Sequence, residues 1–357
     1  MYAKIILRTF GIIAILLTVF PYISWNQWYI RIFDFPHLQL TLLTLVALLV
    51  YFLKFNIKSF KDYLFVAALG SCFLFQAIKI YPYTAFSDFE VKDSSTTAKE
   101  KLSLYTLNVL QKNEKFSKVI DNAKKDDADI LLFTETNQRW VDALRKEFLE
   151  DYKYHVAVPL ENTYGMLLLS KQKLYQPQIK YIVEDTIPSI HTKLIFSSND
   201  TLQLYAIHPA PPTPQHNPSS VDRDAEMMKI TRLVRNSELP VIVLGDFNDV
   251  AWSETTALFQ NVSGLLDLRK GRGFYSTYNA KNWLMRWPLD HVFTSSDFRI
   301  SKVHRGDNVG SDHFPFFTQL SYEPELAYQQ ELPPPTKNQL ETAFKQLEEE
   351  KEEDFKK

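Results

Sequence analysis

VIVLGDFND, residues 241–249, is an apolar run that ends in acidic residues and an amide. Residues 241–244 are typical of a strand that is buried on both faces of a sheet. Such a strand carries the residues after it to one sheet edge, where ligands usually bind in layered α/β folds. Asp246 and Asn248 are two positions apart, so an extended backbone would point both side chains the same way. The alternative is a plain turn, because Gly, Asp and Asn are common turn residues.

Composition sets broad limits on the rest of the chain. Its 357 residues leave room for two domains. The formal net charge of -2 gives no indication of an overall basic protein that would bind nucleic acid. The single cysteine, Cys72, excludes both an intramolecular disulfide and a zinc site built from several cysteines.

Three apolar stretches, residues 5–23, 38–53 and 63–78, precede residue 84. With their flanks, each is close to the roughly 20 residues that a helix needs to span a bilayer. A signal peptide would explain only the first stretch, and a buried helical bundle is the alternative for all three. We therefore predict a membrane anchor, with the short aromatic segment 26–35 at the outer membrane interface.

Positive charge predicts the orientation of this anchor. Lys4 and Arg8 precede the first stretch, and Lys54, Lys58 and Lys61 lie between the second and the third. The positive-inside rule places these charges in the cytoplasm. Because the number of spans is odd, everything after residue 84 is expected outside the cytoplasm. The expected partner of the anchor is the lipid bilayer.

Four segments follow from these patterns. Residues 1–83 form the anchor, and the polar residues 84–100 are expected to form a linker that acts as a tether. Residues 101–322 alternate short apolar runs with helical patterns, which predicts one α/β domain of about 220 residues. Residues 323–357 are highly charged and are expected to be a solvated tail, either helical or disordered.

Polar residues stand at the ends of several predicted strands in this domain. One buried amide or carboxylate is commonly a satisfied structural group, but a series of them at one sheet edge suits metal-assisted phosphoryl chemistry. Oxygen ligands favour Mg²⁺, Mn²⁺ or Ca²⁺ over zinc. The residues in question are Asn108, Glu135, His208, Asp246, Asn248, Asp290, Asp312 and His313.

This ordered set resembles the endonuclease/exonuclease/phosphatase superfamily, which includes DNase I, abasic-site endonucleases, neutral sphingomyelinases and inositol polyphosphate 5-phosphatases. GDFN at 245–248 and SDH at 311–313 are the strongest signals, and the likeness runs from about residue 101 to 322. Several apolar spans before a minimal catalytic domain are similar to a bacterial membrane-anchored subgroup. The resemblance implies a four-layered α/β sandwich of DNase I type, preceded by three transmembrane helices.

The resemblance also implies roles for individual residues. Glu135 would be the principal ligand of Mg²⁺ or Mn²⁺, helped by Asn108 and Asp312. His313, oriented by Asp290, would act as a general base or stabilise the phosphate. Asp246 would hold or deprotonate the attacking water, and Asn248 and His208 would contact the phosphate.

Three neighbouring residues allow more than one interpretation. His291 follows Asp290 directly and is expected on the opposite face of its strand. Arg286 either reaches a phosphate or has only a surface role. Ser311 is expected to support its loop, because no GxSxG elbow is present to make it a nucleophile.

The sequence leaves the substrate open. One hypothesis is a phosphoesterase that acts on a lipid-linked phosphate, with Phe274, Tyr275, Tyr278, Trp283 and Trp287 either forming a rim or packing in the core. The alternative is an extracytoplasmic nuclease for DNA or RNA, which needs a basic groove. A catalytically inactive binding module is disfavoured by the intact motifs, and nothing indicates an obligate protein partner. The candidate groove residues are Arg269, Lys270, Arg272, Lys281 and Arg286.

Overall fold

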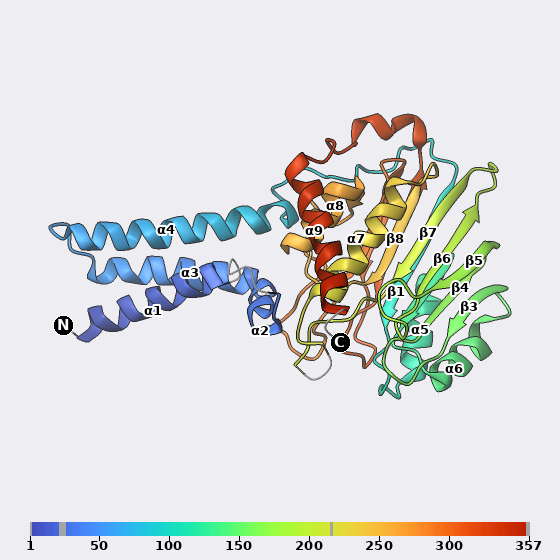
Figure 1. The fold of residues 1–357 in the computed structure, drawn as a ribbon, viewed down its shortest axis with the longest axis horizontal. Helices are drawn as coiled ribbons and strands as arrows, with labels where there is room; N and C mark the ends of the chain where they lie inside the picture. The colour runs from blue at the N-terminus through green and yellow to red at the C-terminus, as the bar shows by residue number, and fades with distance from the viewer. Residues whose placement is uncertain (1, 21–25, 215–216, 355–357) are drawn as a thin grey trace.

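Three long helices project from one end of a layered α/β sandwich in the computed structural model (Figure 1). The structure describes residues 2–20, 26–214 and 217–354. The last residues of the first predicted span, 21–23, lie outside this range, as does the very end of the predicted tail.

Two six-stranded mixed sheets face each other. The first has the order β11 (Phe298–Arg305), β12 (Phe316–Tyr322), β1 (Lys101–Asn108), β2 (Ile130–Thr134), β4 (Met166–Ser170) and β3 (Tyr154–Val158). The second has the order β5 (Leu174–Lys180), β6 (Ser189–Ile195), β7 (Thr201–Ile207), β8 (Val241–Asp246), β10 (Asp290–Thr294) and β9 (Leu266–Asp267).

Helices cover the outer face of each sheet, so the domain has four layers. In β1, Leu104 packs in the core between the sheets, whereas its neighbour Tyr105 faces the outer helices, as strand alternation requires. The predicted DNase I-like α/β sandwich is therefore confirmed. The helices are α5 (Phe116–Asp126) and α6 (Gln138–Phe148) on the first sheet, and α7 (Val221–Arg235) and α8 (Glu254–Ser263) on the second.

The topology brings the ends of several strands to one edge. β1 runs parallel to β2, and β7 runs parallel to β8, so the residues that end these four strands emerge together. β10 and β12 run antiparallel to β8 and β1, so the residues at their beginnings lie at the same edge. The sheets thus gather polar groups from six strands.

The three projecting helices are long and apolar enough to cross a membrane. Among the described residues, Ala14, Ala47 and Leu69 form a small common core with a few partly buried side chains packed against it, and many of the other apolar side chains are exposed. That surface suits lipid better than water. These helices are α1 (Tyr2–Val19), α3 (His37–Tyr51) and α4 (Phe60–Ile80); shorter pieces are α2 (Trp28–Arg31) and the 3₁₀ turns Ile32–Asp34, Phe52–Lys54, Tyr81–Tyr83 and Pro324–Gln329.

The segment expected to be a free tether packs along the catalytic domain instead. Val91 is fully buried in the core between the sheets. Glu90 forms an ion pair with Lys270 at 3.0 Å, and Asp93 forms one with Arg272 at 2.7 Å. The tether interpretation was wrong because polar composition does not reveal charge partners that lie far away in the sequence.

The expectation of a solvated tail is also wrong. Residues 337–354 form the helix α9 (Lys337–Asp354), which lies beside α7 (Figure 1). Its Ala343 and Leu347 are buried in the core that α7 and α8 form on the second sheet. Glu350 also pairs with Lys229 of α7 at 2.7 Å. Two buried apolar residues one turn apart, together with this ion pair, hold an otherwise charged helix against the domain.

Candidate active site

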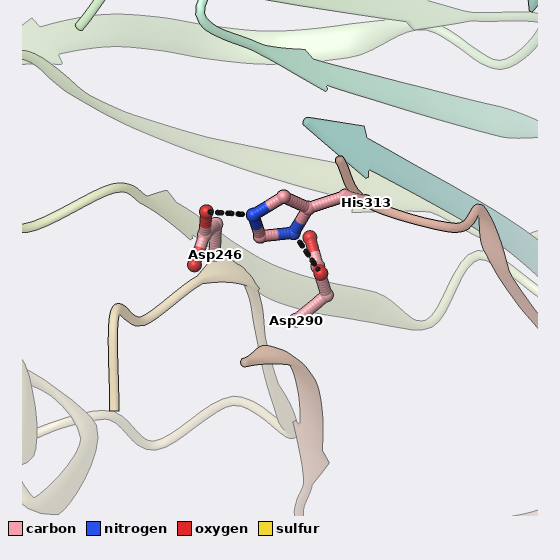
Figure 2. Close-up of side chains that lie close together, drawn as sticks. All are labelled: Asp246, Asp290 and His313. Carbon is pink, nitrogen blue, oxygen red and sulfur yellow. Dashed lines mark hydrogen bonds and ion pairs between the residues drawn. The ribbon is translucent and has the colours of Figure 1, made fainter. Parts of the chain in front are cut away.

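His313 lies between two aspartates at the polar edge of the sheets (Figure 2). Asp246 ends β8 and Asp290 begins β10, and the two residues are direct partners in the antiparallel register. His313 Nδ1 is 2.7 Å from Asp290 Oδ2, and its Nε2 is 3.6 Å from Asp246 Oδ2. Because an ionised carboxylate only accepts, Nδ1 carries the proton in the bond to Asp290.

The electrostatics of this cluster favour a charged imidazole. Burial alone lowers the pKa of His313, but the charges of Asp290 and Asp246 outweigh burial and raise the pKa to about 10. Asp290 also fixes the ring orientation, in the manner of carboxylate–histidine pairs. The ring edge at Nε2 is left facing Asp246.

Asn108 and Glu135 form the second part of the site. Asn108 Nδ2 lies 2.9 Å from Glu135 Oε1 and 3.0 Å from Asp246 Oδ2, so one amide joins carboxylates from both sheets. The backbone N–H of Gln111 donates to Glu135 Oε2 at 3.2 Å. Glu135 has φ 59°, a left-handed conformation that non-glycine residues rarely adopt and that is common at functional sites.

The GDFN stretch is a tight turn that also contributes to the site. Asn248 has φ 52°, and its backbone N–H donates to Asp246 Oδ1 at 3.0 Å. Its side chain donates to Pro209 O at 2.9 Å, so the expectation that Asp246 and Asn248 point the same way from an extended backbone is wrong. Position 245, just before the turn, requires glycine because a Cβ there would lie 1.9 Å from Ile207 O of β7.

The remaining predicted residues are close by. His208 follows β7, is buried, and places Nε2 3.8 Å from Asp246 Oδ2. Ser311 donates to Asn108 O at 2.6 Å and accepts from the backbone N–H of His313, so it supports the loop as expected. Asp312 lines a cavity beside His313.

This cavity has a volume of about 340 Å³ and is lined by both polar and apolar residues. The apolar ones include Trp28, Ile32 and Phe35 from the segment that joins the first two long helices. The sequence signalled this segment only as aromatic, and its place at the site was missed. The walls are formed by Trp28, Ile32, Phe35, Asn108, Glu135, Pro211, Pro212, Thr213, Asn248, Tyr278, Trp287, Leu289, Asp312 and His313.

The donor set fits a divalent cation. Glu135 and Asp312 face the cavity, and among the described residues no lysine or arginine lines it. Apart from the imidazole of His313, the charged groups that a phosphate would meet among the described lining residues are the carboxylates of Glu135 and Asp312, and a bound cation would offset their repulsion. Asp246, Asp290 and His313 also place ligand atoms within 4.8 Å of one another. In that cluster, His313 and Asp290 already satisfy each other with a hydrogen bond.

Other basic and imidazole groups have structural surroundings. His291 is buried on the opposite face from Asp290, with Nε2 2.9 Å from Asp249 O and Nδ1 2.7 Å from Arg269. Arg269 itself is buried, and both Lys270 and Arg272 are paired with the segment before β1. The basic groove expected from this stretch is therefore not formed by these three residues.

The fold and the convergent carboxylates, amide and imidazole define a metal-dependent hydrolase of phosphate esters. Residues 105–313 match the profile of the Endonuclease/Exonuclease/phosphatase family. The chain belongs to this family, as the motifs predicted. The comparison with curated proteins found no match.

Solved structures share the fold at low sequence identity. D. rerio TDP2 complexed with a single-strand DNA product is 15% identical, with a TM-score of 0.53, and the match covers 62% of this chain and 99% of that one. A family protein from Bacteroides thetaiotaomicron is 14% identical, with a TM-score of 0.50, coverage being 63% and 99%. The human Nocturnin catalytic domain with bound sulfate is 17% identical, with a TM-score of 0.50, coverage being 67% and 98%. These likenesses establish the fold.

Proposed function

We propose that this protein is a membrane-anchored phosphoesterase in which water attacks a phosphate ester or anhydride of a lipid-linked substrate. The observation that carries the proposal is the shared cavity: Ile32 and Phe35 of the anchor form part of the wall of the cavity that Glu135 also lines. A phosphate held by the polar residues would have apolar side chains of the anchor available for its apolar group. An apolar wall next to a few polar groups is typical of sites for amphiphilic ligands.

The metal proposal assigns Glu135 as the principal ligand of Mg²⁺ or Mn²⁺, with Asn108 and Asp312 as further ligands. When bound, the ion supplies positive charge that stabilises the negative charge developing on the phosphate. Asn108 Oδ1 accepts from the backbone N–H of Leu110 at 2.9 Å, which restrains the amide beside Glu135. The amide nitrogen of Asn108 faces Glu135, and a flip of the amide would turn its oxygen, the atom that can ligate a cation, towards an ion held there.

The remaining protein groups of the site would position and deprotonate the attacking water and stabilise the charge on the phosphate. Asp246 holds the attacking water and accepts its proton. His313, oriented by Asp290, presents Nε2 to a phosphate oxygen, and Asn248 and His208 complete the contacts. The 3.6 Å between Asp246 Oδ2 and His313 Nε2 leaves both atoms available to the same reacting group.

We further propose that residues 1–83 anchor the protein in a bacterial cell membrane as a multi-pass segment, and that 84–100 link them to the catalytic domain, 101–322, outside the cytoplasm. Residues 323–357 follow as the charged C-terminal segment. Arg8 pairs with Asp62 at 2.7 Å at the end of the helices far from that domain, where the positive charges gather. A reporter that is active only in the cytoplasm, fused to the C-terminus, is expected to stay inactive. An active reporter would contradict this orientation.

Ile32→Ser tests the role of the apolar wall. Ile32 is 50% exposed, so its replacement should leave the fold intact. We expect kcat/KM for an isoprenyl pyrophosphate in mixed micelles to fall roughly tenfold, because apolar contacts of this size contribute about 1–3 kcal/mol. Hydrolysis of soluble bis(p-nitrophenyl) phosphate should not change.

The matched control for that experiment is Ile57→Ser, which changes an isoleucine that is 77% exposed between α3 and α4, away from the cavity. It should leave both activities unchanged. Duplex DNA is the third substrate. If the wild-type protein hydrolyses DNA but no lipid phosphate, the lipid proposal is wrong and the nuclease alternative is correct.

A further inference from the structure

A second cavity lies between the catalytic domain and the start of α3. Its volume is about 490 Å³, and it shares no lining residue with the catalytic cavity. Two arginines and several apolar side chains form its walls. The residues used below are Leu38, Gln39, Trp283, Leu284, Arg286 and Arg305.

Both arginines lack a carboxylate partner. Among the described residues, neither Arg286 nor Arg305 forms an ion pair within 4.0 Å. Their guanidinium carbons lie over the same ring, that of Phe314, at 4.9 and 4.0 Å from its centroid. Two like charges this close to one ring repel each other, and a bound anion would offset that repulsion. Burial and the charge of Arg286 both lower the pKa of Arg305, as expected for such a pair.

Part of the donor capacity of these arginines is unused. Arg286 donates through Nε to Asn279 O and Asn282 O, and Arg305 donates through one terminal nitrogen to Ser276 O at 3.0 Å. No hydrogen bond to the described residues engages the two terminal nitrogens of Arg286. The backbone contacts hold both side chains in place, while several N–H groups remain for a ligand. Such a fork matches the oxygens of a phosphate.

The cavity opens at the level where α3 begins. Gln39, in the first turn of that helix, donates to Leu284 O at 2.7 Å. Trp283 and Leu284 beside it are 81% and 54% exposed, and they form an apolar tip next to a helix long enough to span a bilayer. Tryptophan and leucine in such a position are typical of groups that enter the membrane interface.

We propose that Arg286 and Arg305 form a binding site for the phosphate of an anionic phospholipid headgroup, with Trp283 and Leu284 contacting its glycerol and acyl region. The lipid is a partner of the bilayer and is not the substrate. The site rests on the proposed membrane anchoring and does not depend on hydrolysis. Lipid bound there would hold the catalytic domain against the membrane surface through a second point of attachment, besides the helices.

The test uses the detergent-solubilised full chain titrated with short-chain phosphatidylglycerol, phosphatidylcholine and inorganic phosphate, with binding followed by calorimetry. We expect phosphatidylglycerol to bind more tightly than the other two. The double variant Arg286→Gln/Arg305→Gln should weaken that binding at least tenfold. Hydrolysis of bis(p-nitrophenyl) phosphate should remain at the wild-type level, because neither residue lines the catalytic cavity.

The charge-matched control is Arg139→Gln/Arg232→Gln, which removes two surface arginines from α6 and α7. Equal weakening in both double variants would show unspecific charge attraction and overturn the proposal. Inorganic phosphate that binds as tightly as phosphatidylglycerol, with the same dependence on the arginines, would overturn the lipid assignment. Arg286→Lys keeps the charge but loses the fork, and we expect intermediate binding. If the double variant fails to fold, Arg286→Lys and Arg305→Lys decide the question alone, and unchanged affinity in both contradicts the site.

Discussion

Glu135→Gln is expected to reduce phosphoester hydrolysis by about 10²–10³-fold, the range typical of losing one preorganised charge contact in an active site. Glutamine keeps the shape of the side chain and can still accept from Asn108 Nδ2 or the Gln111 backbone N–H. The change therefore removes charge and leaves the packing largely intact. Affinity for Mn²⁺, measured by calorimetry or by its magnetic resonance signal, should fall together with the rate.

Glu161→Gln is the matched control for this variant. Glu161 accepts from Asn137 at 3.2 Å and does not line the catalytic cavity. It should change neither the rate nor the Mn²⁺ affinity. Unchanged Mn²⁺ affinity in Glu135→Gln would show that the ion sits elsewhere, and the cluster of Asp246, Asp290 and His313 would then be the next candidate.

His313→Ala is expected to lower kcat by about 10²–10⁴-fold, the usual contribution of a positioned acid–base or charge-stabilising imidazole. Asp290→Asn should cost less, because its effect passes through the ring that it orients at 2.7 Å. The double variant should then be no slower than His313→Ala alone, since residues that act as a unit do not have additive effects. Rates measured at saturating metal for the two single variants and the double variant check this.

His155→Ala, on β3 and away from the site, is the control and should retain full activity. Thermal unfolding of each variant separates loss of chemistry from loss of fold. Additive losses in the double variant would mean that Asp290 contacts the substrate, the metal or the water independently of His313.

The site motifs could be predicted because each follows a strand whose apolar pattern is local. Asn108 and Asp246 end buried strands and Glu135 directly follows one, and parallel pairing brings such ends to one edge. The side-chain direction of Asn248 could not be predicted, because its left-handed φ depends on the turn and on Pro209 across the sheet. The left-handed backbone conformation of Glu135 could not be predicted either, because it too depends on the folded surroundings.

Sequence patterns also could not predict the elements whose packing partners lie far away in the sequence. β5 is an edge strand with the sequence LYQPQIK, whose Pro177 and exposed side chains resemble a loop. Val91, Ala343 and Leu347 are isolated apolar residues in polar segments, and their burial depends on surfaces that exist only after the domain has folded. The cavity wall from Trp28 to Phe35 depends on how the helices dock, which no local pattern reports.

That wall has a kinetic consequence. If the anchor lies in the bilayer as proposed, enzyme and lipid substrate diffuse in the same plane, and encounters depend on the number of substrate molecules per unit of membrane area. Confinement of two partners sets an effective concentration that bulk volume does not alter. Turnover would then follow the mole fraction of substrate among the surrounding lipids: adding inert lipid to the same membrane slows the enzyme, whereas diluting the whole suspension leaves the rate per enzyme unchanged.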